Sequence, residues 1–306
     1  MNVLYADFSS KGTVVALGSF DGLHLGHMAV INSAKNMAAQ LSAIPVICTF
    51  SEHPLKVLTG EAPPALFAGD VRDEAFRNTG VEVVRLDFAS IREMSPEEFV
   101  GEILVKTLNV KGVCCGFNYN FGAKGAGTAE LLAQMCREGG IGFSMAPPMT
   151  LDGEPVSSTR IREALKSGNV ELANRMLGRP FKYRLRVIDG DKRGRTWGIP
   201  TINQKYDPAL VLPRLGVYAS RCMVDGRLYY GATNLGVRPT IEEGEPVSSE
   251  TYLLDYDGDL YGKYVDVSLL RFLRPEQKFD SMEALETQMK RDIDTIRVIA
   301  ENEIEA

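Results

Sequence analysis

Short apolar runs and longer amphipathic segments alternate along the first half of the chain. We predict strands at five apolar runs: Thr13–Gly18, Ile44–Phe50, Val81–Asp87, Val110–Gly116 and Gly142–Ala146. We predict helices at three periodic segments: His27–Gln40, one starting at the Ser95-Pro96-Glu97-Glu98 capping box, and Thr128–Glu138. This alternation predicts a mostly parallel sheet with helices on both faces and ligand sites at the carboxyl ends of its strands.

The pattern changes after two further predicted helices, Ser158–Ser167 and Val170–Leu177. From Tyr183 onward, short β-branched and aromatic segments are separated by Asp-Gly turns, which is typical of an antiparallel barrel or sandwich. The periodic segment Ser281–Ile304 predicts one helix packed on this β domain. We therefore expect an α/β protein with one domain in residues 1–180 and an antiparallel β-barrel domain with a terminal helix in residues 181–306.

Composition narrows the possible partners. The chain has 306 residues, of which 44% are hydrophobic, so it can bury the cores of two domains. Its net charge of −6 is shared by both halves, which argues against nucleic acid and favours small-molecule substrates. The N-terminus resembles no signal peptide and no segment approaches the roughly 20 apolar residues of a membrane span, so we expect a cytoplasmic protein without a membrane partner. The oligomeric state is left open.

Five cysteines form no CxxC pair, and we expect them to be reduced core residues. This spacing supports neither a disulfide framework nor a zinc site.

The first candidate site is the segment GSFDGLHLGH at residues 18–27, which follows a predicted strand and opens a predicted helix. Backbone N–H groups and the positive end of the helix dipole can face an anion at such a turn. The segment matches neither GxxxxGK[ST] nor GxGxxG. Two of the three histidines in the chain, His24 and His27, lie in it, and the plain alternative is that they are polar turn residues.

The HxGH pattern resembles the nucleotidylyltransferase superfamily, in which the histidine pair contacts the nucleotide triphosphate. The resemblance implies a Rossmann-like domain and catalytic roles for His24 and His27. A phosphate monoester that attacks the α-phosphorus of ATP is already ionised, so the site must bind developing charge rather than supply a base. We expect the rest of the turn to shape this phosphate site, through Gly18, Phe20, Asp21, Gly22 and Gly26.

A second element, VSSTRIR at residues 156–162, supports this interpretation. Taken alone it is a capped helix start, but superfamily members carry a similar serine/threonine and arginine element downstream. Its hydroxyl and guanidinium groups are good phosphate donors. We therefore expect phosphate contacts from Ser157, Ser158, Thr159, Arg160 and Arg162.

Eight segments in order resemble the prokaryotic bifunctional riboflavin kinase/FAD synthetase family. They are GSFDGLHLGH (18–27), TFSEHP (49–54), GFNYNFG (116–122), VSSTRIREAL (156–165), LGRPF (177–181), GDKRGRTWGIPTIN (190–203), NLGVRPT (234–240) and ETYLLDYDGDLYGK (250–263). The resemblance implies an enzyme that makes FMN from riboflavin and then FAD from FMN. It also implies Mg²⁺ with ATP, an FMN adenylyltransferase domain in residues 1–180 and a riboflavin kinase domain in residues 181–306.

By this resemblance the flavin of the first domain lies beside Phe50, His53, Pro54 and Asn118. Phe50 ends a predicted strand at the ligand edge of the sheet, where an aromatic ring can stack on an isoalloxazine. A plain core role for Phe50 and a turn role for His53 stay open.

The second candidate site is residues 190–203, where a glycine-rich cationic loop ends in Pro200-Thr201-Ile202-Asn203. Such a loop can wrap ATP phosphates, although a basic hairpin loop has the same composition. We assign the phosphate contacts to Gly190, Lys192, Gly194, Arg195 and Gly198. The ending resembles the family's PTAN motif, which implies that Thr201 and Asn203 hold magnesium and the transferring phosphate, with Ile202 replacing the usual alanine.

Glu250 opens the predicted strand ETYLLDY and matches the family's catalytic glutamate. Riboflavin offers a neutral 5′-hydroxyl, so a general base helps its phosphorylation. Without the resemblance, a glutamate at the start of a strand is usually just solvated.

Two other functions compete with this one. A single-activity adenylyltransferase or cytidylyltransferase could use the β domain only for dimerisation or regulation, but the PTxN segment and Glu250 argue against it. A flavin-binding regulator descended from such an enzyme would have lost catalytic residues, whereas His24, His27, Thr201, Asn203 and Glu250 are all present.

Overall fold

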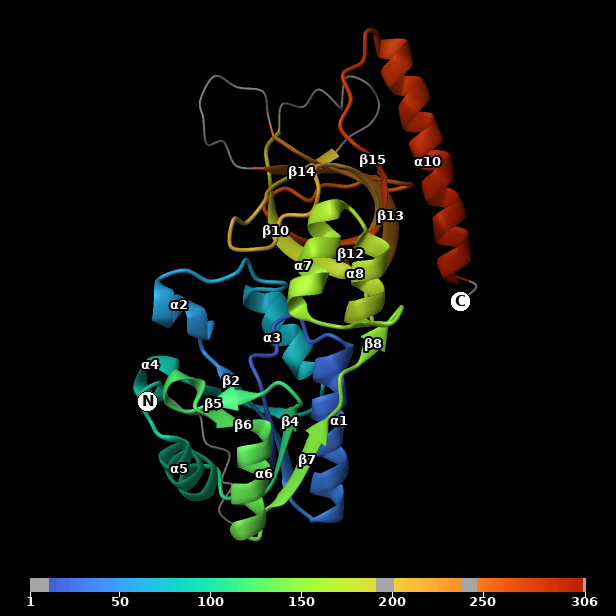
Figure 1. The fold of residues 1–306 in the computed structure, drawn as a ribbon. Helices are drawn as coiled ribbons and strands as arrows, with labels where there is room; N and C mark the ends of the chain where they lie inside the picture. Colours follow the sequence, from blue (N-terminus) through green and yellow to red (C-terminus); the bar gives the residue numbers. More distant parts are fainter. Residues whose placement is uncertain (1–10, 191–200, 238–246, 305–306) are drawn as a thin grey trace. The chain divides into compact units, whose positions relative to one another are not determined.

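The computed structural model describes residues 11–190, 201–237 and 247–304, which form two compact units (Figure 1). The first unit contains residues up to Pro63 together with Arg72–Ser157. The second contains Pro64–Val71 and the chain from Ser158 onward. The chain therefore passes between the units three times.

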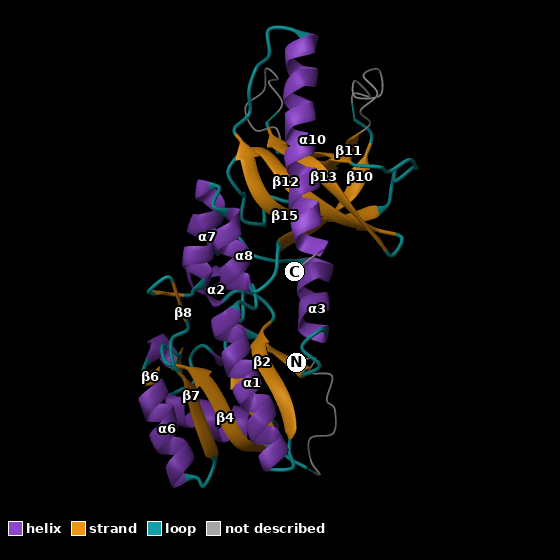
Figure 2. Cartoon of the chain, turned by 90° about the vertical axis from the view of Figure 1, so that its right-hand side faces the viewer, coloured by secondary structure: helices purple, strands orange, loops and turns teal. Residues whose placement is uncertain are grey.

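A parallel sheet with strand order β3-β2-β1-β4-β7 forms the centre of the first unit (Figure 2). Its strands are β1 (Thr13–Leu17), β2 (Ile44–Phe50), β3 (Glu82–Leu86), β4 (Val110–Gly116) and β7 (Gly142–Ala146). This confirms the predicted sheet, with β2, β4 and β7 at their predicted bounds. The chain runs from β1 to β3 on one side and returns to place β4 on the other side of β1. The order therefore reverses at β1, which is where parallel sheets of this kind bind ligands.

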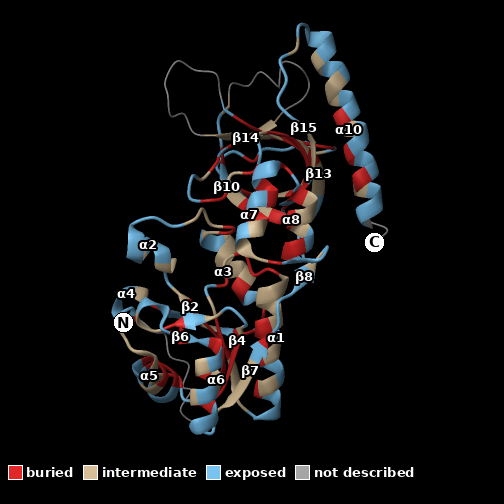
Figure 3. Cartoon of the chain, in the orientation of Figure 1, coloured by how far each residue is buried: buried red, intermediate tan, exposed pale blue. Residues whose placement is uncertain are grey.

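Helices cover both faces of this sheet. Helix α1 (Leu25–Gln40) packs on one face with its buried side chains Val30, Ile31, Ala34 and Ala38. The π-helix η1 (Phe99–Thr107) and helix α6 (Ala129–Glu138) join the other face in one apolar core (Figure 3). Cys48 belongs to this core, and burial raises the pKa of its thiol to about 12, so it is a neutral packing residue.

Several short elements of the first sequence half have too few residues to show a period, and the hydrophobic pattern did not predict them. The helical ones are α2 (Pro54–Thr59), α3 (Gly69–Arg77), α4 (Phe88–Ile91) and η2 (Ala123–Gly125). The short strands are β5 (Asn120–Phe121), β6 (Gly127–Thr128), β8 (Thr150–Leu151) and β9 (Glu154–Pro155).

The capping box predicted at Ser95 is present at the start of helix α5 (Pro96–Glu98), which continues into η1. Glu98 N donates to Ser95 Oγ at 3.1 Å, and Ser95 N donates to Glu98 Oε2 at 2.7 Å. We expect Ser95→Ala to lower the free energy of unfolding of the first unit by about 1 kcal/mol, because one N–H group at the helix start loses its acceptor. Urea unfolding followed by circular dichroism measures this change.

Ser90→Ala is the matched control, because the Ser90 hydroxyl donates to the exposed carbonyl of Asp87 and caps no N–H group. An equal loss of stability in both variants would show that the capping box contributes nothing special.

The second unit contains a closed antiparallel barrel with strand order β10-β11-β14-β13-β12-β15. Its strands are β10 (Phe181–Ile188), β11 (Thr201–Lys205), β12 (Gly216–Val224), β13 (Arg227–Gly236), β14 (Ser248–Leu253) and β15 (Tyr264–Arg274). Of the two architectures expected from the sequence, a barrel or a sandwich, the structure has the barrel. Strand β11 was not predicted as a strand, because its sequence TINQK contains a single apolar residue and shows no alternation of apolar and polar positions.

Polar side chains inside the barrel satisfy one another. Ser220 Oγ lies 2.7 Å from Thr233 Oγ1, which lies 2.8 Å from Thr251 Oγ1. Tyr183 and Ser249 form a second buried pair, 2.9 Å apart between their hydroxyl oxygens. Such pairing removes most of the cost of burying hydroxyl groups.

Helix α10 (Met282–Ile304) runs along the outside of the barrel, as predicted (Figure 1). Its side chains Ile296 and Ile299 pack with Ala219, Leu254 and Leu270 of the barrel unit. A buried ion pair of 2.9 Å between Arg274 and Asp292 adds a directional contact.

Helices α7 (Ser158–Ser167) and α8 (Val170–Leu177) have their predicted bounds but belong to the barrel unit. Asn174 of α8 accepts a hydrogen bond from Phe181 N at 2.7 Å and donates to Leu269 O at 2.8 Å. The segment 64–71 also belongs to this unit, since Ala65 pairs with Leu210. Residue 180 as the boundary between the two activities stays a prediction.

Candidate active sites

The turn between β1 and α1 has an unusual backbone. Phe20 and Leu23 have φ angles of 52° and 40°, a region that side chains other than glycine rarely adopt. Hydrogen bonds anchor the turn to the neighbouring strand, because Gly18 N donates to Cys48 O at 3.3 Å and Thr49 Oγ1 donates to Ser19 O at 3.0 Å. Strained backbone that is held this firmly is common where a turn must aim its groups at a ligand.

His24 and His27 lie together at the N-terminus of α1. His24 is the N-cap, and its Nδ1 accepts a hydrogen bond from His27 N at 3.3 Å. The two rings stack with centroids 3.6 Å apart, and the His27 ring also meets the Phe20 ring edge to face. Because Nδ1 of His24 is an acceptor, a neutral His24 carries its proton on Nε2, which makes Nε2 a donor.

Gly26 makes this stacking possible. A Cβ atom at Gly26 would lie 3.1 Å from His24 Cε1 and 3.2 Å from its Nδ1, which is closer than ordinary packing. The glycine of the HxGH motif therefore keeps space for the first histidine ring.

The predicted flavin residues lie at the same edge of the sheet as this turn. Leu17 at the end of β1 pairs with Cys48 of β2 and Cys115 of β4, so the segments that follow these strands are neighbours. Phe50 ends β2 and is half-buried, with its ring against Phe88. Asn118 follows β4 and is exposed. The structure thus brings these predicted residues to the ligand edge without testing their roles.

His53 has a local structural role in this structure. It is the N-cap of α2, and its Nδ1 accepts from Leu55 N at 3.2 Å, with Pro54 at the first helical position. The turn role that the sequence left open is therefore present, and a flavin contact of His53 stays a prediction.

Arg72 is a residue at this edge that no motif indicated. Its guanidinium donates to Phe50 O at 2.9 Å and to Ser51 O at 3.4 Å. Burial lowers the pKa of Arg72, and nearby Asp21 acts in the opposite direction. The cation therefore ties α3 to the end of β2, close to the histidine turn.

The division of the chain into units falls inside the downstream phosphate element, between Ser157 and Ser158. Ser157 is the last residue of the first unit, and a Cβ at Gly26 would lie 3.8 Å from the carbonyl oxygen of Val156 just before it. Ser158, Thr159, Arg160 and Arg162 start α7 in the second unit. Arg162 is buried and its Nε donates to Pro64 O at 2.7 Å. Phosphate contacts of these residues stay predictions.

The register of the barrel strands places the predicted kinase residues Thr201, Asn203 and Glu250 on one face of the barrel wall. Asn203 of β11 pairs directly with Glu250 of β14, so both side chains project from one face of the barrel wall. Thr201 lies on the same face two residues earlier, and Asn203 Nδ2 lies 3.4 Å from its Oγ1. Gly190 lies against Asn203, since a Cβ there would collide with the amide. Lys192, Gly194, Arg195 and Gly198 lie outside the described residues.

A cavity of about 300 Å³ opens beside Thr201. Its lining includes Tyr256, Leu260 and Tyr261, which the sequence analysis did not single out. They belong to the segment ETYLLDYDGDLYGK, which was recognised as a motif but yielded only Glu250. The second half of this motif lies beside Thr201 only in the folded chain, so the sequence did not indicate that it lines this cavity.

Family comparisons cover both units. A family model described as FAD synthetase matches residues 7–160, and one described as riboflavin kinase matches residues 177–300. The bifunctional riboflavin kinase/FMN adenylyltransferase of Listeria monocytogenes is 37% identical, with 94% of this chain and 92% of that protein aligned. The chain belongs to this bifunctional family.

A second relative has the same description, and a solved structure has a similar fold under another description. The bifunctional riboflavin kinase/FMN adenylyltransferase of Bacillus subtilis is 35% identical, with 92% of this chain and 90% of that protein aligned. A crystal structure from Streptococcus pneumoniae, described as a macrolide-efflux protein, matches with a TM-score of 0.86 at 32% identity, covering 94% of this chain and 95% of that one. Within the described residues, no helix combines the length and the apolar character needed to cross a bilayer.

As a member of the bifunctional riboflavin kinase/FMN adenylyltransferase family, the chain is an enzyme that converts riboflavin to FMN and FMN to FAD. The FAD synthetase match contains the parallel sheet with its histidine turn. The riboflavin kinase match contains the barrel with Thr201, Asn203 and Glu250.

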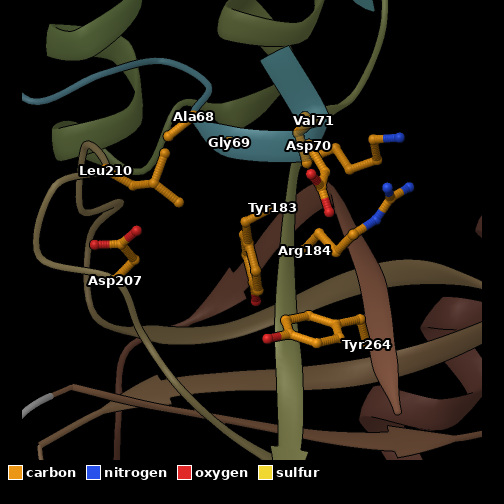
Figure 4. Close-up of a pocket in the computed structure, with 10 residues that line it drawn as sticks. Ala68, Gly69, Asp70, Val71, Tyr183, Arg184, Asp207, Leu210 and Tyr264 are labelled. Atoms are coloured by element: carbon orange, nitrogen blue, oxygen red, sulfur yellow. The ribbon is translucent and has the colours of Figure 1, made fainter. Parts of the chain in front are cut away.

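The barrel unit of this family member has a second cavity, of about 240 Å³, away from these residues (Figure 4). Lys182 and Arg184 of β10 line it, and both bind Asp266 of β15. Burial raises the pKa of Asp266, but hydrogen bonds from Arg184 and Lys182 outweigh burial and hold this pKa below its usual value. Lys182 and Arg184 form ion pairs with this carboxylate. No motif of the sequence indicates a ligand at this cavity.

Proposed function

We propose that adenylyl transfer to FMN takes place at the histidine turn of the first unit and riboflavin phosphorylation at the Thr201, Asn203 and Glu250 face of the barrel. The observation that carries the first assignment is the stacked histidine pair at the N-terminus of α1. The direct pairing of Asn203 with Glu250 carries the second.

In the first reaction a phosphate oxygen of FMN attacks the α-phosphorus of ATP, and the bond from that phosphorus to the pyrophosphate oxygen breaks. Negative charge grows on the bridging and non-bridging oxygens, so positioned donors accelerate the step. His24 Nε2 and the His27 ring supply such donors, together with the helix N-terminus. The ring of Phe50 and the amide of Asn118 contact the flavin.

In the second reaction the 5′-oxygen of riboflavin attacks the γ-phosphorus of ATP, and ADP leaves. Glu250 accepts the 5′-hydroxyl proton as the new bond forms. Thr201 Oγ1 and the Asn203 amide oxygen would hold Mg²⁺, because this ion prefers hard oxygen ligands and usually takes few protein ligands beside substrate phosphates. Held there with ATP, this ion would neutralise charge on the phosphates. We assign part of the nucleotide to the cavity beside Thr201, because this cavity adjoins the proposed magnesium ligand.

Incubation of the purified protein with riboflavin and MgATP, followed by chromatography of FMN and FAD, tests both assignments together. FMN without FAD would contradict the first assignment, and FAD only from added FMN would contradict the second. We also propose a cytoplasmic location, which fits five buried cysteines and the supply of ATP there.

We expect a fragment of residues 181–306 to fold and to make FMN, and a fragment of residues 158–306 to do so with higher thermal stability. The longer fragment keeps α7 and α8, including the contacts of Asn174 with Phe181 and Leu269. Thermal unfolding and FMN formation measure the two properties. If both fragments fold and neither makes FMN, the kinase chemistry does not belong to the barrel alone.

A further inference from the structure

Glu250 lies between two asparagines on neighbouring strands. It pairs with Asn203 of β11 on one side and with Asn234 of β13 on the other. Directly paired residues of an antiparallel sheet project from the same face, with side chains in reach of one another. Asn234 is therefore a direct cross-strand neighbour of the proposed base, as Asn203 is on the other side, although no motif assigned it a role.

The orientation of the Asn234 amide follows from its partner. Asn234 Nδ2 lies 3.2 Å from Glu276 Oε1, and because a carboxylate only accepts, the nitrogen must be the atom that faces Glu276. The amide oxygen Oδ1 then faces away from Glu276. It is buried, and no described residue donates a hydrogen bond to it. Buried polar atoms almost always have partners, so this oxygen indicates a donor that a ligand supplies.

Gly236 provides the space for this arrangement. A Cβ atom at Gly236 would collide with the carboxylate of Glu276, and it would lie 3.1 Å from Asn234 Nδ2. The glycine therefore lets an exposed carboxylate reach across the sheet and fix the amide. Glu250, Asn234 Oδ1 and Glu276 together form a group of hydrogen-bond acceptors on one patch of the barrel wall.

We propose that Asn234 binds the ribityl chain of riboflavin, accepting a hydrogen bond from a hydroxyl next to the 5′-hydroxyl, while Glu276 holds the amide in place. This rests on the proposed role of Glu250 at the 5′-hydroxyl. Adjacent strands are about 4.8 Å apart, so a side chain beside Glu250 meets the neighbouring part of the substrate chain. A hydroxyl group can donate to the unpartnered acceptor Asn234 Oδ1, and Glu276 acts as a positioning residue.

Asn234→Ala in the full chain tests this proposal by steady-state FMN formation, which reports the kinase site alone. We expect KM for riboflavin to rise about tenfold, since a bound hydroxyl loses its acceptor, with kcat changed less than about twofold. Lumiflavin has the same ring system without the ribityl chain, so its inhibition constant against riboflavin should not change. Glu276→Ala, at an exposed position, should raise KM about threefold in the same selective way.

Ser248→Ala is the matched control, because Ser248 lies on the Glu250 face and its hydroxyl donates to Gly236 O at 3.3 Å. We expect it to leave both constants unchanged. A parallel rise of KM for riboflavin and of the lumiflavin constant would overturn the proposal, as would a shift only in the Mg²⁺ requirement. Glu250→Gln separates the proposal from its premise, because loss of kcat there supports the base while an unchanged KM in Asn234→Ala rejects the ribityl contact.

Discussion

Replacing Glu250 with glutamine is expected to lower the rate of FMN formation by about 10²–10⁴-fold, the usual contribution of a general base. The substitution keeps the size and hydrogen bonding of the side chain, and it keeps the pairing of β14 with β11 and β13. Flavin binding should therefore change little, so the loss should appear in kcat. Single-turnover FMN formation with saturating MgATP measures it.

Thr201→Ala distinguishes the loss of a proposed magnesium ligand from the loss of the proposed base. It removes a hydroxyl proposed to hold magnesium and the transferring phosphate, so higher Mg²⁺ should restore part of the rate for Thr201→Ala but none for Glu250→Gln. FAD synthesis from supplied FMN should persist in both variants, because that reaction is assigned to the first unit, and circular dichroism of both variants checks that the barrel is folded. If Glu250→Gln phosphorylates riboflavin normally, Glu250 is a solvated strand residue and the base lies elsewhere.

Most of the sheet and its main helices were predictable because their sequences carry a clear period. Strands β2, β4 and β7 and helices α7 and α8 have their predicted bounds. Strand β11 was missed because TINQK is polar, and it becomes a strand only by pairing with both β10 and β14. Barrel closure, a tertiary effect, overrides local propensity there.

The sequence also did not indicate which helices and segments belong to which of the two units. Helices α7 and α8 follow the α/β pattern, so they were grouped with the first domain, yet Asn174 links α8 to the barrel strands. The segment 64–71 was likewise placed in the first domain because of its position in the chain. In the structure Ala65 pairs with Leu210, and the segment belongs to the barrel unit. A one-dimensional pattern cannot report contacts between residues far apart in the chain.

Candidate site residues could be found where a motif places polar groups close together in the sequence, as at His24 and His27. Arg72 was missed because it reaches the end of β2 from a separate helix. Asn234 was inside a recognised motif, but its importance depends on cross-strand register with Glu250. Register is set by the turns and by barrel closure, so the sequence alone does not reveal it.

Replacing His27 with alanine is expected to lower the rate of FAD formation from FMN by about 10²–10³-fold, the scale for removal of one preorganised donor. The His27 ring stacks on His24 at the N-terminus of α1, while its backbone N–H, which bonds His24, is retained in the variant. Helix α1 should therefore persist, and FMN formation in the barrel unit should be unchanged. Ser33→Ala, on the same helix, is the matched control and should form FAD at the normal rate. Undiminished FAD formation by His27→Ala would remove the basis for adenylyl transfer at this turn.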